Sequence, residues 1–123
     1  MKIRIHNNSV RYRLTKSEVQ MLATKGVVVG ETTFGPGHLQ KLVYSLEARE
    51  GIEGLGAEFV GHKITVFIPS TDAKAWPGNE RVGFEQTVQA TPESGLHLLV
   101  EKDFVCMDES VEDQSDHYAN PKA

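Results

Sequence analysis

The sequence of 123 residues contains one cysteine, Cys106, and no long apolar run. A single cysteine excludes an intrachain disulfide and is typical of proteins that fold in a reducing compartment. No stretch approaches the roughly 20 apolar residues that span a membrane. Lys2, Arg4 and His6 interrupt the N-terminus, where a secretory signal would need an apolar segment. We therefore expect a cytoplasmic protein without membrane contact.

Patterns typical of catalysis or of cofactor binding are also scarce. The glycine-containing stretches 35–37 and 51–56 match no phosphate-binding loop, and no Asp-x-Asp-x-Asp-Gly calcium loop occurs. Cys106 and His117 lie in an acidic region, but zinc sites typically need more Cys and His ligands than these two. His97 should point to the opposite face of its strand from Cys106, which argues against a nucleophilic pair. The sequence thus predicts no catalytic residue, metal site or cofactor, and it favours a non-enzymatic role.

The net charge of −4 gives no case for nucleic-acid binding, but the charge is unevenly distributed. The first 14 residues hold four basic residues and no acidic one, whereas acidic residues crowd the end of the chain: Asp103, Asp108, Glu109, Glu112, Asp113 and Asp116. Such asymmetry is typical of an interaction segment or of two ends that meet. Because periodicity is lost after Cys106, we expect a single domain over 1–106 and an irregular acidic tail over 107–123.

Residues 2–14 alternate with a period of two, which predicts a β-hairpin whose turn is Asn7-Asn8. One face would carry Ile3, Ile5, Val10, Tyr12 and Leu14, and the other Lys2, Arg4, His6, Ser9, Arg11 and Arg13. In this register Arg4 faces Arg11 and Lys2 faces Arg13. Like charges directly opposite one another destabilise a strand pair. The basic face therefore needs anions, either from this chain or from a ligand.

The remaining elements follow from local signals. Thr15 and Glu18 form a predicted capping box and Gly26 a stop, which indicates a helix over about 15–25. Strands are expected from residue 27, over 39–49, over 82–88 and over 96–105, with a second hairpin over 56–68 around Gly61-His62. Trp76 should plug an edge of the core. About seven strands and one helix predict an α+β domain with a curved, mostly antiparallel sheet that could roll into a barrel, capped by the helix.

Two segments resemble a family of small bacterial proteins of unknown function. They are the basic N-terminal hairpin leading into Thr15-Lys16-Ser17-Glu18-Val19, and the C-terminal stretch Val100-Glu101-Lys102-Asp103-Phe104-Val105-Cys106-Met107-Asp108, which fits a VEKDFxCxD motif. The resemblance extends over nearly the whole chain. It implies a bacterial cytosolic domain and carries no activity, cofactor or site residue.

Two hypotheses for function remain open. The first is a non-enzymatic structural or protein-interaction module, in which acidic residues of the same chain neutralise the basic face and a partner protein binds elsewhere, for example at a sheet edge. The second is an anion-binding module, in which Lys2, Arg4, Arg11 and Arg13 hold a phosphate-containing small molecule or an acidic protein segment.

Overall fold

The computed structural model describes residues 1–104, and this part of the chain forms eight strands and two short α-helices. The elements in order are β1 (Lys2–His6), β2 (Ser9–Leu14), α1 (Lys16–Lys25), β3 (Val27–Thr33), β4 (Lys41–Arg49), β5 (Gly56–Val60), β6 (Lys63–Pro69), α2 (Ser70–Ala75), the 3₁₀ turn η1 (Trp76–Gly78), β7 (Gly83–Thr91) and β8 (Ser94–Lys102). The expected tail over 107–123 lies outside the described residues.

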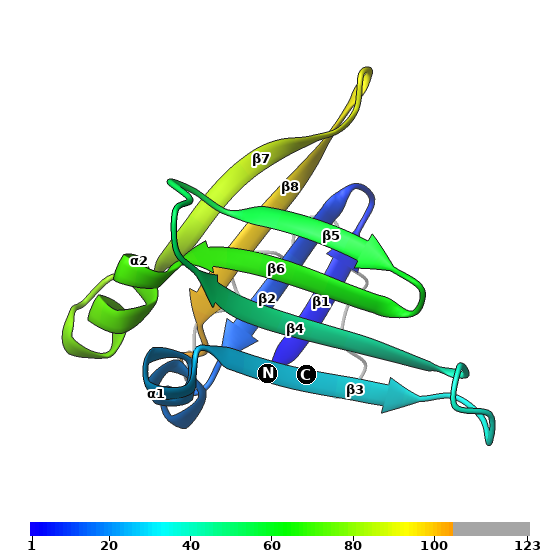
Figure 1. The fold of residues 1–123 in the computed structure, drawn as a ribbon, viewed down its shortest axis with the longest axis horizontal. Coiled ribbons are helices and arrows are strands. Elements are labelled where there is room, and N and C mark those ends of the chain that lie inside the picture. Colours follow the sequence, from blue (N-terminus) through cyan, green and yellow to red (C-terminus); the bar gives the residue numbers. More distant parts are fainter. Residues whose placement is uncertain (105–123) are drawn as a thin grey trace, which may run out of the picture.

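The strands form two separate four-stranded sheets, one with the order β1-β2-β8-β7 and the other with the order β3-β4-β6-β5. Each sheet consists of two antiparallel hairpins that meet at a central parallel pair, β2 with β8 and β4 with β6. Figure 1 shows one sheet in front of the other, with crossing strand directions and both helices at one end. The α+β class with mostly antiparallel sheets is confirmed. The possible barrel is corrected: the two sheets do not close, because among the described residues no strand of one sheet pairs with a strand of the other.

Both predicted hairpin registers are confirmed residue by residue. In the first, Ile3 pairs with Tyr12 and Arg4 with Arg11, around a turn in which Asn7 has a positive φ of 51°. In the second, Phe59 pairs with Ile64 around a turn in which Gly61 has a φ of 61°. Asparagine and glycine tolerate this left-handed backbone better than other residues do. Each two-residue turn therefore fixes the register of its hairpin.

Helix α1 begins and ends as its sequence predicts. The Thr15 side chain accepts a hydrogen bond from the Glu18 N–H, and the Glu18 carboxylate accepts one from the Thr15 N–H, 2.9 Å away, which is the reciprocal capping box. Gly26 ends the helix in a left-handed conformation with a φ of 81°. Val19 and Leu22 are buried, so α1 packs its short apolar stripe onto the core.

Large side chains fill the space between the sheets at the helical end. Trp76 is fully buried, its indole N–H donates to the Arg81 carbonyl over 2.7 Å, and its ring meets Phe84 edge-on with centroids 5.0 Å apart. Leu14 and Ile68, near the ends of β2 and β6, are fully buried in the same hydrophobic cluster as these two residues. The expectation that Trp76 plugs an edge of the core is confirmed. The helical end of the molecule is therefore closed.

The two halves of the described chain have the same architecture. Each half runs hairpin, helix, hairpin, with β1–β4 around α1 and β5–β8 around α2. If β1, β2, β3 and β4 are replaced by β5, β6, β7 and β8, and the reverse, the order β1-β2-β8-β7 becomes β5-β6-β4-β3. This is the order of the other sheet read from its opposite edge. We call this relation the internal two-fold. It equates the β1–β2 hairpin with the β5–β6 hairpin and therefore brings corresponding residues of the two sheets to opposite walls of the space between them.

Candidate functional site

An open groove lies between the sheets at the end opposite the helices. Its volume is about 600 Å³, within the range of roughly 300–1,000 Å³ typical of binding pockets. All four hairpins contribute apolar side chains to its walls: Ile5, Val10, Leu42, Ala57, Phe59, Ile64, Val88, Ala90 and Leu96. The polar residues along it are Asn8, Glu58 and Gln89. The groove is therefore an apolar site with few polar groups at its rim.

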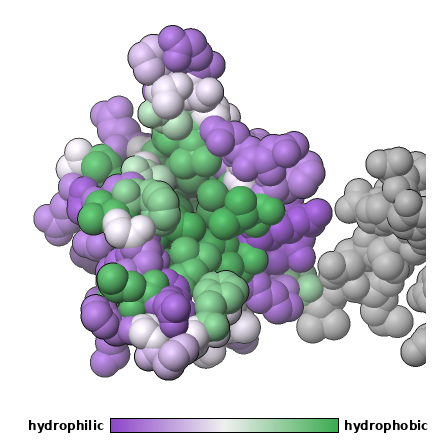
Figure 2. Space-filling model, turned by 90° about the vertical axis from the view of Figure 1, so that its right-hand side faces the viewer, coloured by the Kyte–Doolittle hydropathy of each residue, from purple (hydrophilic) through white to green (hydrophobic). Residues whose placement is uncertain are grey.

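The groove is open to solvent, whereas the helical end of the molecule is filled by buried side chains. Phe59 is 69% exposed and Ile5 is 55% exposed, whereas Trp76 at the helical end is 0% exposed. Figure 2, which views the molecule from the right-hand side of Figure 1, shows apolar surface gathered at the centre of this face and polar surface around it. Both residues had been expected on the core side of their hairpins. They do face the space between the sheets, but no element in this part of the chain covers that end.

The internal two-fold runs through the groove. Ile5 and Phe59 each lie two residues before a two-residue turn, and Val10 and Ile64 each lie two residues after it. Both pairs line the groove, one member from each sheet. The groove is thus built from corresponding apolar positions of the two halves rather than from a chance gap in packing.

Three edge strands border the groove, because β1, whose Ile5 lines it, also ends the order of its sheet. β5 is an edge strand of one sheet, and its residues 57–59 line the groove. β7 is an edge strand of the other sheet, and its residues 88–90 line the groove. An edge strand has backbone N–H and C=O groups on one side that no neighbouring strand pairs. Among residues 1–104, the groove therefore combines apolar side-chain pockets with main-chain donors and acceptors that no neighbouring strand pairs.

The predicted basic face lies on the outer side of the β1-β2-β8-β7 sheet. Arg4 faces Arg11 across the β1–β2 pair, Arg11 faces Leu99 of β8, and Leu99 faces Glu85 of β7. In the neighbouring row Lys2, Arg13 and Glu101 follow one another. The sheet therefore brings together all four sequence-predicted residues: Lys2, Arg4, Arg11 and Arg13.

Carboxylates of the same chain neutralise part of this face. Lys2 Nζ lies 3.2 Å from an Asp103 oxygen, and Glu101 Oε1 lies 3.1 Å from Arg11 Nε and 3.8 Å from Arg13 Nε. No N–H of residues 1–104 makes a well-directed hydrogen bond to that Glu101 oxygen, so it acts through charge alone. The Lys2, Arg11 and Arg13 pairs join side chains that are partly exposed to solvent, and pairs at a protein surface contribute about 0–1 kcal/mol each.

Arg4 differs from the other three cations. Within residues 1–104 no carboxylate oxygen lies within ion-pair distance of its guanidinium. Arg4, His6, Ser9 and Arg11 together line a polar depression of about 220 Å³ on the outer face of the hairpin. The basic face is therefore neutralised at the Lys2 end and open at the Arg4 end.

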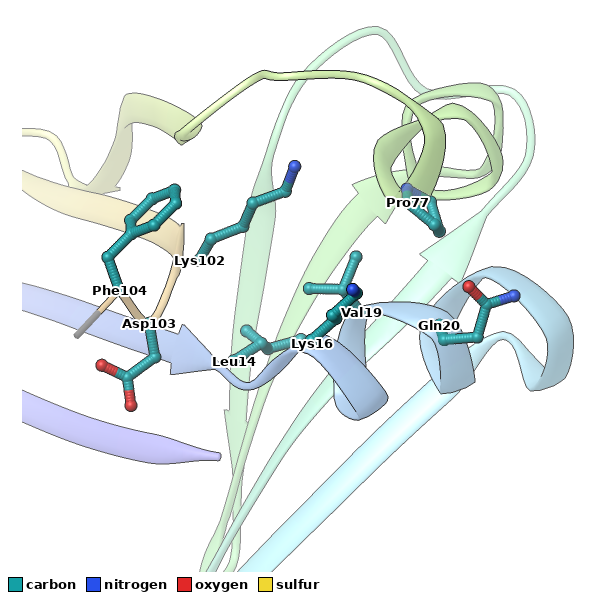
Figure 3. Close-up of a pocket in the computed structure, with 8 residues that line it drawn as sticks. All are labelled: Leu14, Lys16, Val19, Gln20, Pro77, Lys102, Asp103 and Phe104. Carbon is teal, nitrogen blue, oxygen red and sulfur yellow. The ribbon is translucent and has the colours of Figure 1, made fainter.

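A further cavity of about 290 Å³ lies between the first turn of α1, η1 and the end of β8. Figure 3 shows Phe104 and Lys102 above Leu14 and Val19, with Pro77 at the far side. Two of its polar groups already have partners inside the protein: Lys102 Nζ donates to the Asn79 carbonyl over 2.8 Å, and Asp103 pairs with Lys2. Its other polar lining residues are Lys16 and Gln20.

Among residues 1–104, two ionisable side chains have a shifted pKa, and both have structural roles. Burial raises the pKa of the Tyr12 hydroxyl, which donates to the Ile64 carbonyl over 3.3 Å and so links the two sheets. Burial opposes ionisation of Glu18, but the Met1 ammonium and the Thr15 hydrogen bonds outweigh it and lower the pKa of that carboxyl. Neither group lines the groove or the Arg4 depression.

Comparison with known proteins identifies the family. A family of unknown function (DUF7009) matches residues 1–122. The chain belongs to this family. Searches of the curated proteins and of the solved structures gave no match.

For this member of the family, the described residues contain no cluster of three or more His, Cys, Asp or Glu side chains that could hold a metal ion. Cys106 and His117, weighed above as metal ligands, lie outside these residues. None of the helices in this part of the chain has the length and apolar character that crossing a membrane requires.

The sequence pointed to the basic face but not to the groove. Ile5 and Phe59 have the ordinary alternation of core-facing residues, and nothing local to either strand indicates that the space beyond them is open. The one available signal is their position beside tight turns, at the end of each hairpin that is farthest from its helix.

Proposed function

We propose that this domain is a non-enzymatic protein-interaction module that binds an extended apolar segment of a partner protein in the groove between its sheets. The observation that carries this proposal is the placement of an apolar groove along sheet edges, with residues of the edge strands β5 and β7 in its walls. An extended segment can add to a sheet edge through its main chain while every second side chain enters a neighbouring pocket.

The groove suits side chains from such a segment on energetic grounds. Burying one large apolar side chain contributes about 1.5–3 kcal/mol, and the walls offer Phe59, Ile64 and Leu96 as contact surfaces. Two exposed large apolar residues at the mouth, Ile5 and Phe59, are themselves better stabilised when a partner covers them. The same end is therefore both the available site and the part of the surface that gains most from binding.

A peptide selection tests the proposal. Peptides displayed on phage are selected against the full chain, and we expect enriched sequences in which apolar residues occupy alternate positions. Phe59→Glu should weaken the binding of these peptides by about tenfold or more, because it loses one large apolar contact and 1.4 kcal/mol corresponds to a factor of ten.

Phe34→Glu is the matched control, because Phe34 is 75% exposed and does not line the groove. Its peptide affinities should stay at the level of the unmodified protein. Selection that enriches no alternating apolar pattern, or peptides that bind both variants equally well, would contradict the proposal.

A further inference from the structure

Arg4 and Arg11 form a like-charge pair that the architecture does not require. The internal two-fold equates them with Glu58 and Thr65, which face one another at the same place in the β5–β6 hairpin. The same hairpin geometry therefore forms with a carboxylate and a hydroxyl at these positions. Two arginines directly opposite one another destabilise the pair unless an anion lies between them.

Carboxylates within residues 1–104 neutralise only part of the positive charge of this arginine pair. Arg11 shares the Glu101 carboxylate with Arg13, and the β8 residue that faces Arg11 is the apolar Leu99. Arg4 has no carboxylate within ion-pair distance in this part of the chain. The carboxylate of Glu85, on β7, does not neutralise Arg4 either. Its Oε1 lies 2.8 Å from His97 Nε2 and pairs with that ring instead. Positive charge is thus concentrated at the Arg4 end of the face.

We propose that the depression formed by Arg4, His6, Ser9 and Arg11 binds a phosphoryl group. Two guanidinium groups supply charged N–H donors with the fixed fork geometry that suits phosphate oxygens. The Ser9 hydroxyl and a His6 ring N–H are further donors on the same surface. A volume of about 220 Å³ lies below the range of roughly 300–1,000 Å³ of pockets that enclose drug-sized ligands. The site therefore fits a small dianionic group and leaves the remainder of a larger ligand in solvent. This site is independent of the groove and of its proposed partner.

Titration calorimetry of the full chain with inorganic phosphate tests this assignment. We expect saturable binding that Arg4→Gln weakens by roughly 10- to 100-fold, the equivalent of one charged hydrogen-bonding partner. Lys63→Gln is the matched control, because it removes one positive charge from the exposed end of β6 in the other sheet. Its phosphate affinity should equal that of the unmodified protein.

Methyl phosphate distinguishes the source of the group. Equal affinity for methyl phosphate and inorganic phosphate would show that the site accepts the terminal group of a phosphomonoester. A strong preference for inorganic phosphate would restrict the site to the free ion. Either result supports a phosphoryl site. The absence of saturable binding of both compounds to the full chain would overturn the proposal. Equal weakening by Arg4→Gln and Lys63→Gln would overturn it as well, since that result indicates only general charge attraction. A thermal midpoint of Arg4→Gln equal to or above that of the unmodified protein verifies that the variant is folded.

Discussion

The Tyr12 side chain is the clearest example of a single residue that joins the two sheets. It is 0% exposed, and its hydroxyl on β2 donates to the Ile64 carbonyl on β6 over 3.3 Å. Its ring lies beside that of Tyr44, with centroids 6.4 Å apart. Neither group of this hydrogen bond is charged, so we expect its net contribution to the free energy of unfolding to be that of a typical neutral hydrogen bond, about 0.5–1.5 kcal/mol.

Alkaline pH should therefore destabilise the protein through Tyr12. Burial raises the pKa of this hydroxyl above its ordinary value of 10.0, so the folded state keeps the neutral form that the unfolded state loses. The resulting stability is fully present below pH 10 and is lost as the pH rises through the folded pKa. Urea denaturation at pH 7 and above pH 10 measures this loss. Tyr12→Phe should lower stability by about 1 kcal/mol at pH 7 and should lose less stability above pH 10 than the unmodified protein.

Tyr44→Phe is the control for this measurement, because it removes the neighbouring hydroxyl and leaves that of Tyr12 in place. It should keep most of the alkaline loss of the unmodified protein, because burial is the largest cause of the raised Tyr12 pKa and the charge of Tyr44 is a smaller one. If Tyr12→Phe and the unmodified protein lost stability equally above pH 10, the phenol of Tyr12 would not be the group responsible.

Among the secondary-structure elements, α1 depends on its N-terminal cap. Thr15→Ala removes the side-chain half of the capping box, in which the Glu18 N–H donates to the Thr15 hydroxyl. We expect a loss of about 1 kcal/mol in the free energy of unfolding, measured by urea denaturation. Thr24→Ala is the control, because its hydroxyl donates only to carbonyls of the preceding turn of the same helix, those of Gln20 and Met21. A change within about 0.5 kcal/mol is expected there, and equal losses in the two variants would remove the cap as the cause.

The β1–β2 and β5–β6 hairpins and α1 could be predicted because their signals are local. A two-residue turn and a period of two together fix the register, since a slip by one residue would move every side chain to the opposite face. The parallel pairs β2–β8 and β4–β6 have no such signal. Ser9 pairs with His97 and Tyr44 with Ile64 across long stretches of chain, and no local pattern specifies either partner. Without those pairs, the eight strands could not be divided into two sheets, and a rolled barrel was an equally reasonable expectation.

The candidate sites show the same limit. The basic residues of β1 and β2 could be placed on one face, because that face belongs to a single hairpin. The partial neutralisation by Glu101 and Asp103 follows from the β2–β8 pairing and its neighbouring loop, so only the structure locates it. The groove forms only when all four hairpins are assembled and no other element of residues 1–104 covers their ends. It could not be derived from the alternation in any one strand.

For the molecule considered as a unit, the most consequential feature is the contrast between its closed and open ends. Phe84, 6% exposed, packs edge-on against Trp76 at the helical end, and Phe59, 69% exposed, lies at the mouth of the groove. Both are phenylalanines on edge strands, so the same substitution reports on the two ends separately. Phe84→Ala should lower the free energy of unfolding by about 3–5 kcal/mol, because it leaves a cavity beside a buried ring. Phe59→Ala should change it by no more than about 0.5 kcal/mol.

Urea denaturation of the two variants side by side measures this contrast. If the groove is a site rather than a weak part of the core, Phe59→Ala must retain full stability while it loses affinity for the selected apolar peptides. A large loss of stability in Phe59→Ala would instead mean that the open end contributes to folding, and the exposed apolar surface would then no longer argue for a partner. Equal stability of both variants would contradict the closed packing of Trp76 and Phe84, on which the distinction between the two ends depends.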